Sequence, residues 1–196
     1  RGNRKSEYAM MELELLSVLA ENAGKAYPTE ELNRMWEMIL TNQFHDILPG
    51  SSIHEVYEQT KKEYAEIAET SAELIGERLN ALCAKKDESV TVWNTLGHRR
   101  NDIVELGANS AEALTDGTNV YPVQQTKDGA VIYAENLPSK GYQVLRPVSG
   151  AAVETPFAVT EAGEGYTLET PFYTIKINAN GEFTSCLLYT SDAADD

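Results

Sequence analysis

Residues 43–52 read QFHDILPGSS, and this stretch divides the N-terminal half of the chain. Before it, apolar residues recur at the spacing of an amphipathic helix. Pro49 and Gly50 then break the pattern, because proline lacks a backbone donor and clashes with the preceding helical turn. The stretch therefore separates two predicted helices and places His45 and Asp46 at the end of the first of them.

Two helices are expected before this break. In residues 3–22, apolar side chains recur every three or four residues, which is typical of a helix packed on one face. That stripe consists of Tyr8, Met11, Leu15, Val18 and Leu19. Gly24 and Pro28 end the helix, and Thr29 can cap the next one. The inner face of this second helix consists of Leu32, Met35, Trp36, Ile39 and Leu40. The spacing continues far enough for the second helix to reach His45.

A long third helix is expected after the break. Ser52 and Glu55 have the spacing of a capping box, in which each side chain bonds the backbone of the other residue. From there to about Lys85, helical spacing is kept by Ile53, Tyr57, Thr60, Tyr64, Ile67, Leu74, Ile75, Leu79 and Leu82. Two shorter helices and a long one favour a three-helix bundle over residues 1–86. So long a stripe leaves open a homo-oligomer in which another chain covers part of it.

The pattern changes at the charged residues 85–88. After them, β-branched residues alternate and turn dipeptides become frequent. Strands are predicted at residues 90–94, 103–106, 120–125, 131–134, 142–145 and 173–177. Asp128–Gly129 and Asn180–Gly181 are predicted hairpin turns, because both residues of such a pair tolerate positive φ. The predicted fold class is therefore α+β: a three-helix bundle followed, over residues 87–184, by a truncated antiparallel β-sandwich that does not close.

Both ends of the chain suggest a piece of a longer protein. The first residue is Arg1, not Met, and a helical pattern follows at once. Residues 185–196 read SCLLYTSDAADD and resemble the translated read-through of a sequencing adapter. We expect this segment to be a non-native tail and the natural sequence to stop near Thr184.

The composition argues against several classes of partner. A net charge of −15 with scattered Lys and Arg is unsuited to nucleic acids or anionic membranes, whose phosphates require clustered positive charge. No run of 18 apolar residues and no signal segment occurs in the sequence. Cys83 and Cys186 lie far apart, without the spacing of a disulfide framework or a metal site. These features predict a soluble, cytoplasmic protein.

The residues alone leave two interpretations of His45 and Asp46. His45 is either a metal ligand or a helix-end histidine that satisfies backbone carbonyls and the helix dipole. Asp46 either accepts hydrogen bonds from sugar hydroxyls or serves as a turn residue. Because tightly held zinc needs about three protein ligands and the chain has 3 histidines without ligand spacing, a self-contained histidine site is excluded.

Several stretches resemble family 38 of the glycoside hydrolases, the retaining α-mannosidases that use zinc. The likeness covers nearly all of residues 1–184 and is close for residues 30–57. The form QFHDILPGSS is most similar to the cytosolic and bacterial branch. Residues 1–7 resemble the opening of the helical middle domain of these enzymes, and residues 92–96, VWNTL, resemble the first strand of the β domain that follows it.

The resemblance implies a role for each residue of the pair. His45 would be the last ligand of a divalent ion, zinc or alternatively cobalt, and Asp46 would contact the mannose bound there. The nucleophile, the acid/base carboxylate and the other ligands would lie in a preceding barrel. The implied function is that of a fragment of a retaining α-mannosidase acting on nonreducing mannosyl residues of glycans or glycosides, inactive in isolation. The alternative is a non-catalytic module for carbohydrate binding or assembly.

Overall fold

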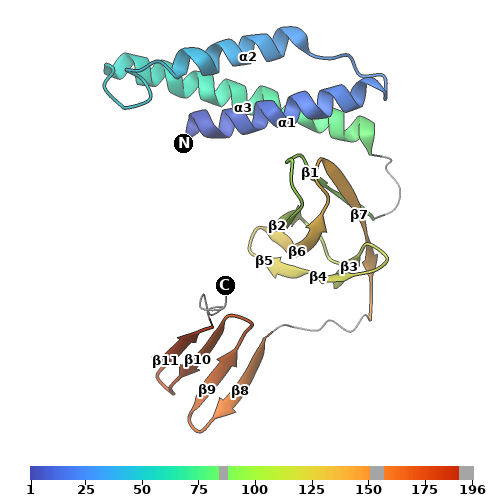
Figure 1. Ribbon diagram of the computed structural model, residues 1–196, viewed down its shortest axis with the longest axis vertical. Coiled ribbons are helices and arrows are strands. Elements are labelled where there is room, and N and C mark those ends of the chain that lie inside the picture. Colours follow the sequence, from blue (N-terminus) through green and yellow to red (C-terminus); the bar gives the residue numbers. More distant parts are fainter. Residues whose placement is uncertain (84–87, 151–156, 190–196) are drawn as a thin grey trace, which may run out of the picture. The chain divides into compact units, whose positions relative to one another are not determined.

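The computed structural model describes residues 1–83, 88–150 and 157–189. The chain divides into two compact units, Arg1–Val148 and Ser149–Asp196. Three helices come first, and antiparallel strands follow (Figure 1). The predicted α+β class is therefore confirmed, whereas the predicted domain limits at residues 86 and 184 stay predictions.

The helices are α1 (Gly2–Glu21), α2 (Thr29–Asn42) and α3 (His54–Leu82). Each helix contacts the other two, so they form a three-helix bundle (Figure 1). The bundle core consists of Met10, Leu13, Leu32, Met35, Ile39 and Ile67. Leu32, Met35 and Ile39 are the buried members of the stripe predicted for α2, whereas Leu40, also predicted to face inward, is 60% exposed.

The prediction for the buried face of α1 was wrong. Tyr8, Met11 and Val18 are each more than half exposed, at 57%, 57% and 53%. The buried face instead consists of Ser6, Met10, Leu13, Leu16, Ser17 and Ala20. The sequence of α1 carries two apolar stripes, and the one with smaller side chains faces the bundle, where small residues allow close approach of the helices. Hydrophobicity alone would predict that the other stripe, with Tyr8, Met11 and Val18, is the buried one.

The helix starts also differ from the predictions. Thr29 is the first residue of α2 and makes no capping bond, because the cap position is occupied by Pro28. The capping box at α3 does not form, since Ile53 occupies the cap position. The backbone N–H of Ser52 instead donates to the hydroxyl of Tyr57, at 3.0 Å. This bond replaces the predicted cap in joining the preceding turn to α3.

Residues 90–148 form two antiparallel sheets. One has the strand order β1-β7-β3-β4 and the other β2-β6-β5. The strands are β1 (Val90–Asn94), β2 (Arg100–Gly107), β3 (Ala113–Thr115), β4 (Val120–Pro122), β5 (Gln124–Thr126), β6 (Gly129–Leu137) and β7 (Gly141–Val148). The strand predicted at residues 120–125 is divided between both sheets. The β5–β6 hairpin forms where predicted, but Gly129 pairs with Thr126, so its loop is Lys127–Asp128.

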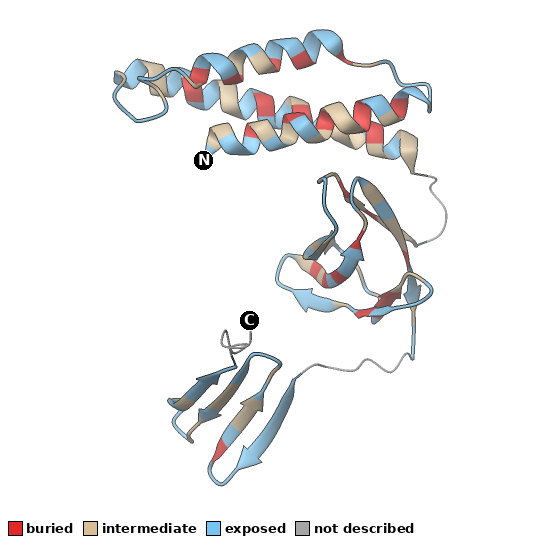
Figure 2. Cartoon of the chain, viewed as in Figure 1, coloured by how far each residue is buried: buried red, intermediate tan, exposed pale blue. Residues whose placement is uncertain are grey.

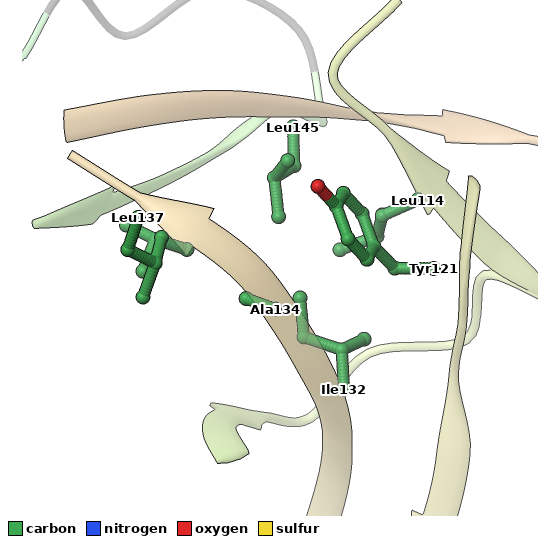
Figure 3. Packing of buried hydrophobic residues seen from close by; sticks show 7 residues of the cluster. Leu114, Tyr121, Ile132, Ala134, Leu137 and Leu145 are labelled. Atoms are coloured by element: carbon green, nitrogen blue, oxygen red, sulfur yellow. The ribbon is translucent and has the colours of Figure 1, made fainter. Parts of the chain in front are cut away.

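The two sheets share one core. Along β6, Ala130, Ile132 and Ala134 are buried while Tyr133 is exposed, as expected for a strand with one inner face. Side chains of both sheets meet between them, and Figure 3 labels Leu114, Tyr121, Ile132, Ala134, Leu137 and Leu145. The expected antiparallel β fold is therefore present, and within it the two sheets of residues 90–148 enclose a common core.

The second unit contains one sheet with the strand order β11-β10-β9-β8. Its strands are β8 (Ala158–Ala162), β9 (Gly165–Glu169), β10 (Tyr173–Ile177) and β11 (Phe183–Leu188). Figure 2 shows these strands mostly in the colours of exposed and intermediate residues. Residues 185–188, predicted to start the non-native tail, belong to β11, and residues 190–196 lie outside the described residues. The origin of this segment stays a prediction.

Candidate functional site

The segment between α2 and α3, residues 43–53, is called the His45 turn below. Helix α2 ends at Asn42, so the prediction that it reaches His45 was wrong. Backbone N–H groups of Ile47 and Leu48 both donate to the carbonyl of Phe44, at 2.9 and 3.2 Å. Gly50 has φ +94°, a conformation that favours glycine. The segment is thus a series of hydrogen-bonded turns.

His45 and Asp46 lie together on the surface of this turn. The Nε2 atom of His45 is 3.5 Å from Oδ2 of Asp46, and the two side chains are 78% and 54% exposed. The imidazole also lies against the ring of Phe44, with centroids 4.2 Å apart. Hydroxyls of Ser51 and Tyr57 each donate to the main-chain carbonyl of Asp46 at 3.4 Å. The turn therefore presents one imidazole and one carboxylate to the surroundings.

A buried polar group lies just before the turn. Asn42 is 2% exposed, its Nδ2 donates to Glu63 at 2.7 Å, and its Oδ1 accepts from the hydroxyl of Thr60 at 2.9 Å. Next to it, Nε2 of Gln43 donates to Glu7 of α1 at 2.7 Å. Hydrophobic spacing in the sequence does not mark Asn42 as a functional residue. The feature of the sequence that could have identified Asn42 is its position three residues beyond Ile39, where the buried stripe of α2 continues with a polar residue.

The described residues contain no group of three or more His, Cys, Asp or Glu side chains that could hold a metal ion. His45 and Asp46 alone fall short of the about three protein ligands that zinc needs. An exposed imidazole beside a carboxylate nevertheless has the donor chemistry of one contributed ligand, since metal-bound histidines are commonly accompanied by carboxylates. The pair therefore fits a metal site that it would share with ligands from elsewhere in the protein, and not a complete metal site.

No helix in the described part of the chain is long and apolar enough to cross a membrane.

Known proteins resemble this chain over most of its length. Residues 1–82 match the family model of the alpha mannosidase middle domain. Alpha-mannosidase 2C1 of Homo sapiens is 30% identical over 97% of this chain and 18% of its own length. The Mus musculus protein of the same name is 28% identical, with the same coverage. A solved structure of a protein in glycosyl hydrolase family 38 from Enterococcus faecalis has a TM-score of 0.64 at 16% identity, over 91% of this chain and 28% of that one.

The family model identifies the helical bundle, residues 1–82, as an alpha mannosidase middle domain. Together the matches support the chain as a fragment of a protein of glycoside hydrolase family 38. The family resemblance noted from the sequence is thereby confirmed, and the solved structure, at its low identity, supports the fold alone. The chain spans 18% of the length of each of the two curated relatives named above.

Proposed function

We propose that this chain is part of a zinc-dependent, retaining α-mannosidase that hydrolyses nonreducing α-mannosyl residues of glycans or small glycosides in the cytoplasm. The observation that carries the proposal is the exposed His45–Asp46 pair, presented by the turn that follows α2 in a domain that matches the family model. Cys83 is a free thiol, in agreement with a reducing compartment.

His45 is the proposed metal ligand. Zinc bound there would act as a Lewis acid and orient the sugar, with cobalt as an alternative ion. The imidazole is 78% exposed, so it is accessible to an ion held jointly with ligands from elsewhere in the protein. Because the other ligands would come from a different part of the polypeptide, metal affinity and the folding of that shared site would be linked.

Asp46 is the proposed sugar-binding residue. An ionised carboxylate only accepts hydrogen bonds, and sugar hydroxyls can donate them. Its main-chain carbonyl receives hydroxyl groups of Ser51 and Tyr57, which restrain its position while the side chain remains 54% exposed. Asp46 would thus bind the sugar next to the metal without taking part in bond cleavage.

The isolated chain should be inactive. A retaining glycosidase needs a nucleophilic carboxylate and an acid/base carboxyl group about 5–5.5 Å apart across the scissile bond. His45 and Asp46 supply a ligand and a hydrogen-bond acceptor, which are different roles. The catalytic pair is proposed to lie outside this chain, in the remainder of the full-length enzyme.

The test compares His45→Ala with His54→Ala in the full-length polypeptide that contains this chain. His54 is a matched control, because its side chain is 80% exposed and lies on α3, beyond the turn. Loss of a direct ligand should lower zinc affinity more than about 100-fold, since removing mere supporting groups lowers it about 10–100-fold. Hydrolysis of an aryl α-mannoside should fall with it. Retention of both by His45→Ala would refute the proposal.

A non-catalytic assembly module is the second candidate. The observation in its favour is the exposed apolar stripe of α1, with Tyr8 and Met11 each 57% exposed. On this alternative, His45→Ala changes neither metal content nor hydrolysis, and the chain self-associates without metal. The same comparison of the two histidine variants therefore discriminates between the candidates.

A further inference from the structure

Asn42 is a buried amide whose two polar ends are both used. At 2% exposure it accepts from Thr60 and donates to Glu63, and the second carboxylate oxygen of Glu63 accepts from Gln59 at 2.9 Å. Thr60, Glu63 and Gln59 all lie on α3. The last turn of α2 is therefore joined to α3 by a connected network, called the Asn42 clamp below (Asn42, Gln59, Thr60, Glu63).

A buried amide is stabilising only where its partners are present, because an unpaired buried polar group loses its hydration without compensation. A slip of one residue along a helix moves side chains by about 1.5 Å and turns them by about 100°. Such a slip would remove Asn42 from Thr60 and Glu63. The clamp thus selects one register of α2 against α3, as buried Asn residues do in coiled coils.

The clamp is connected to His45 through a short, ordered path. His45 follows Asn42 by three residues. The backbone N–H of Gln43 donates to Ile39 and Leu40, and that of Phe44 donates to Thr41 at 3.1 Å. The side chain of Gln43 is also bonded to Glu7 of α1 at 2.7 Å. The residues that lead to His45 are consequently tied to both neighbouring helices.

We infer that Asn42 is a positioning residue for His45, holding α2 in the register that brings the imidazole to its metal. The inference rests on the proposed function, in which His45 is a zinc ligand. Metal–ligand distances must be correct to about 0.2 Å, far less than the about 1.5 Å rise of one helical residue. A change that leaves the bundle folded can therefore still misplace the ligand.

Thr60 allows the clamp to be tested with little change of shape. Thr60→Val removes the hydroxyl and leaves Oδ1 of Asn42 without its donor, whereas Thr60→Ser keeps the hydroxyl. Zinc affinity is measured by competition with a chelator, in the full-length polypeptide that contains this chain. Groups that orient metal ligands typically contribute about 10–100-fold in affinity, so Thr60→Val should weaken zinc binding about tenfold. Thr60→Ser should restore most of that loss.

Ile67→Val provides the matched control for stability. Ile67 is fully buried on α3, about two turns beyond Thr60, and has no polar group. This variant should lower the stability of the bundle in urea unfolding, yet bind zinc with the affinity of the wild type. The inference is overturned if Thr60→Val keeps wild-type affinity, or if Ile67→Val loses as much as Thr60→Val. If His45→Ala keeps zinc, the proposed function itself fails, a result that does not depend on Thr60.

Discussion

The β strands of residues 90–148 and those of residues 158–188 have similar alternating sequences but different surroundings. In the first region, Leu114 and Leu145 are fully buried between two sheets. In the second, Gly165 is the one buried residue among the described residues of the sheet. Alternation thus determines a strand with two distinguishable faces. A core additionally requires a second layer for the apolar face to pack against.

Individual strands of the two regions illustrate this difference. On β6, Ile132 and Ala134 alternate with outward residues and are 2% and 0% exposed. On β10, Ile175 and Ile177 follow the same alternation but are only partly buried, and Tyr173 is 41% exposed. The same period-two pattern therefore contributes much more to stability in β6, where the opposite sheet removes the side chains from water.

The largest expected effect comes from removing a core side chain on one side of this comparison. Leu145→Ala should lower the free energy of unfolding by about 2–5 kcal/mol, through lost burial and the cavity left behind. Leu168→Ala, on the partly exposed strand β9, should lower it by less than about 1 kcal/mol. Hydrogen exchange measured on peptides from each region separates the two. Equal losses of protection would contradict the comparison.

A smaller effect is expected from a buried amide. Asn94 is 3% exposed, and its side chain donates to the carbonyls of His98 and Pro138, both at 2.9 Å. Asn94→Leu leaves these carbonyls unpaired and should reduce stability by about 1–3 kcal/mol in urea unfolding.

Asn178 is the matched control in the second region. It bonds Glu182 and the backbone of its own turn, but lies where water can replace those bonds. Asn178→Leu should therefore reduce stability by less than about 1 kcal/mol. A larger loss from Asn178→Leu than from Asn94→Leu would mean that solvent access does not separate the two regions.

The smallest expected effect concerns Asp116, in the turn between β3 and β4. Burial alone would raise the pKa of its carboxyl group. Hydrogen bonds from the backbone and side chain of Asn119, from the backbone of Thr118 and from the hydroxyl of Tyr121 outweigh burial and lower the pKa from 3.8 to about 2. The folded state therefore favours the ionised carboxylate.

A lowered pKa stabilises the fold above the unfolded value of 3.8, and this stabilisation is lost as the pH falls towards about 2. Allowing for solvent screening of this partly exposed group, it should amount to about 1 kcal/mol. At pH 6, Asp116→Asn should therefore be less stable than the wild type by this amount. As the pH falls from 4 to 2, the wild type loses the contribution and the difference should shrink. Urea unfolding at each pH measures the difference. A difference independent of pH would exclude the carboxylate as its source.

The ends of the helices were more predictable from the sequence than the faces that the helices bury. Pro28 and Pro49 restrict the backbone, and Gly24 and Gly50 allow the positive φ at which a helix ends, so the sequence located the helices to within a few residues. The buried face of α1 could not be located in this way. Which of its two apolar stripes is buried depends on where α2 and α3 pack against it, and this is a tertiary property.

The candidate site was predictable in part for the same reason. His45 and Asp46 stand out because they occupy a break between helices and resemble a family motif. Asn42 looks like an ordinary helix-end polar residue until Thr60 and Glu63 are brought against it by packing. Polar residues that continue a buried stripe are therefore worth examining for partners on the facing helix.

The contact between Phe44 and His45 gives the turn a spectroscopic signal of its own. Their ring centroids are 4.2 Å apart and the ring planes are inclined by 42°. At this separation, the ring current of the phenyl group shifts the magnetic resonance of the imidazole protons. With only 3 histidines in the chain, those resonances are readily assigned by substitution. Rearrangement of the turn on ligand binding can therefore be followed through the imidazole chemical shifts, without an introduced label.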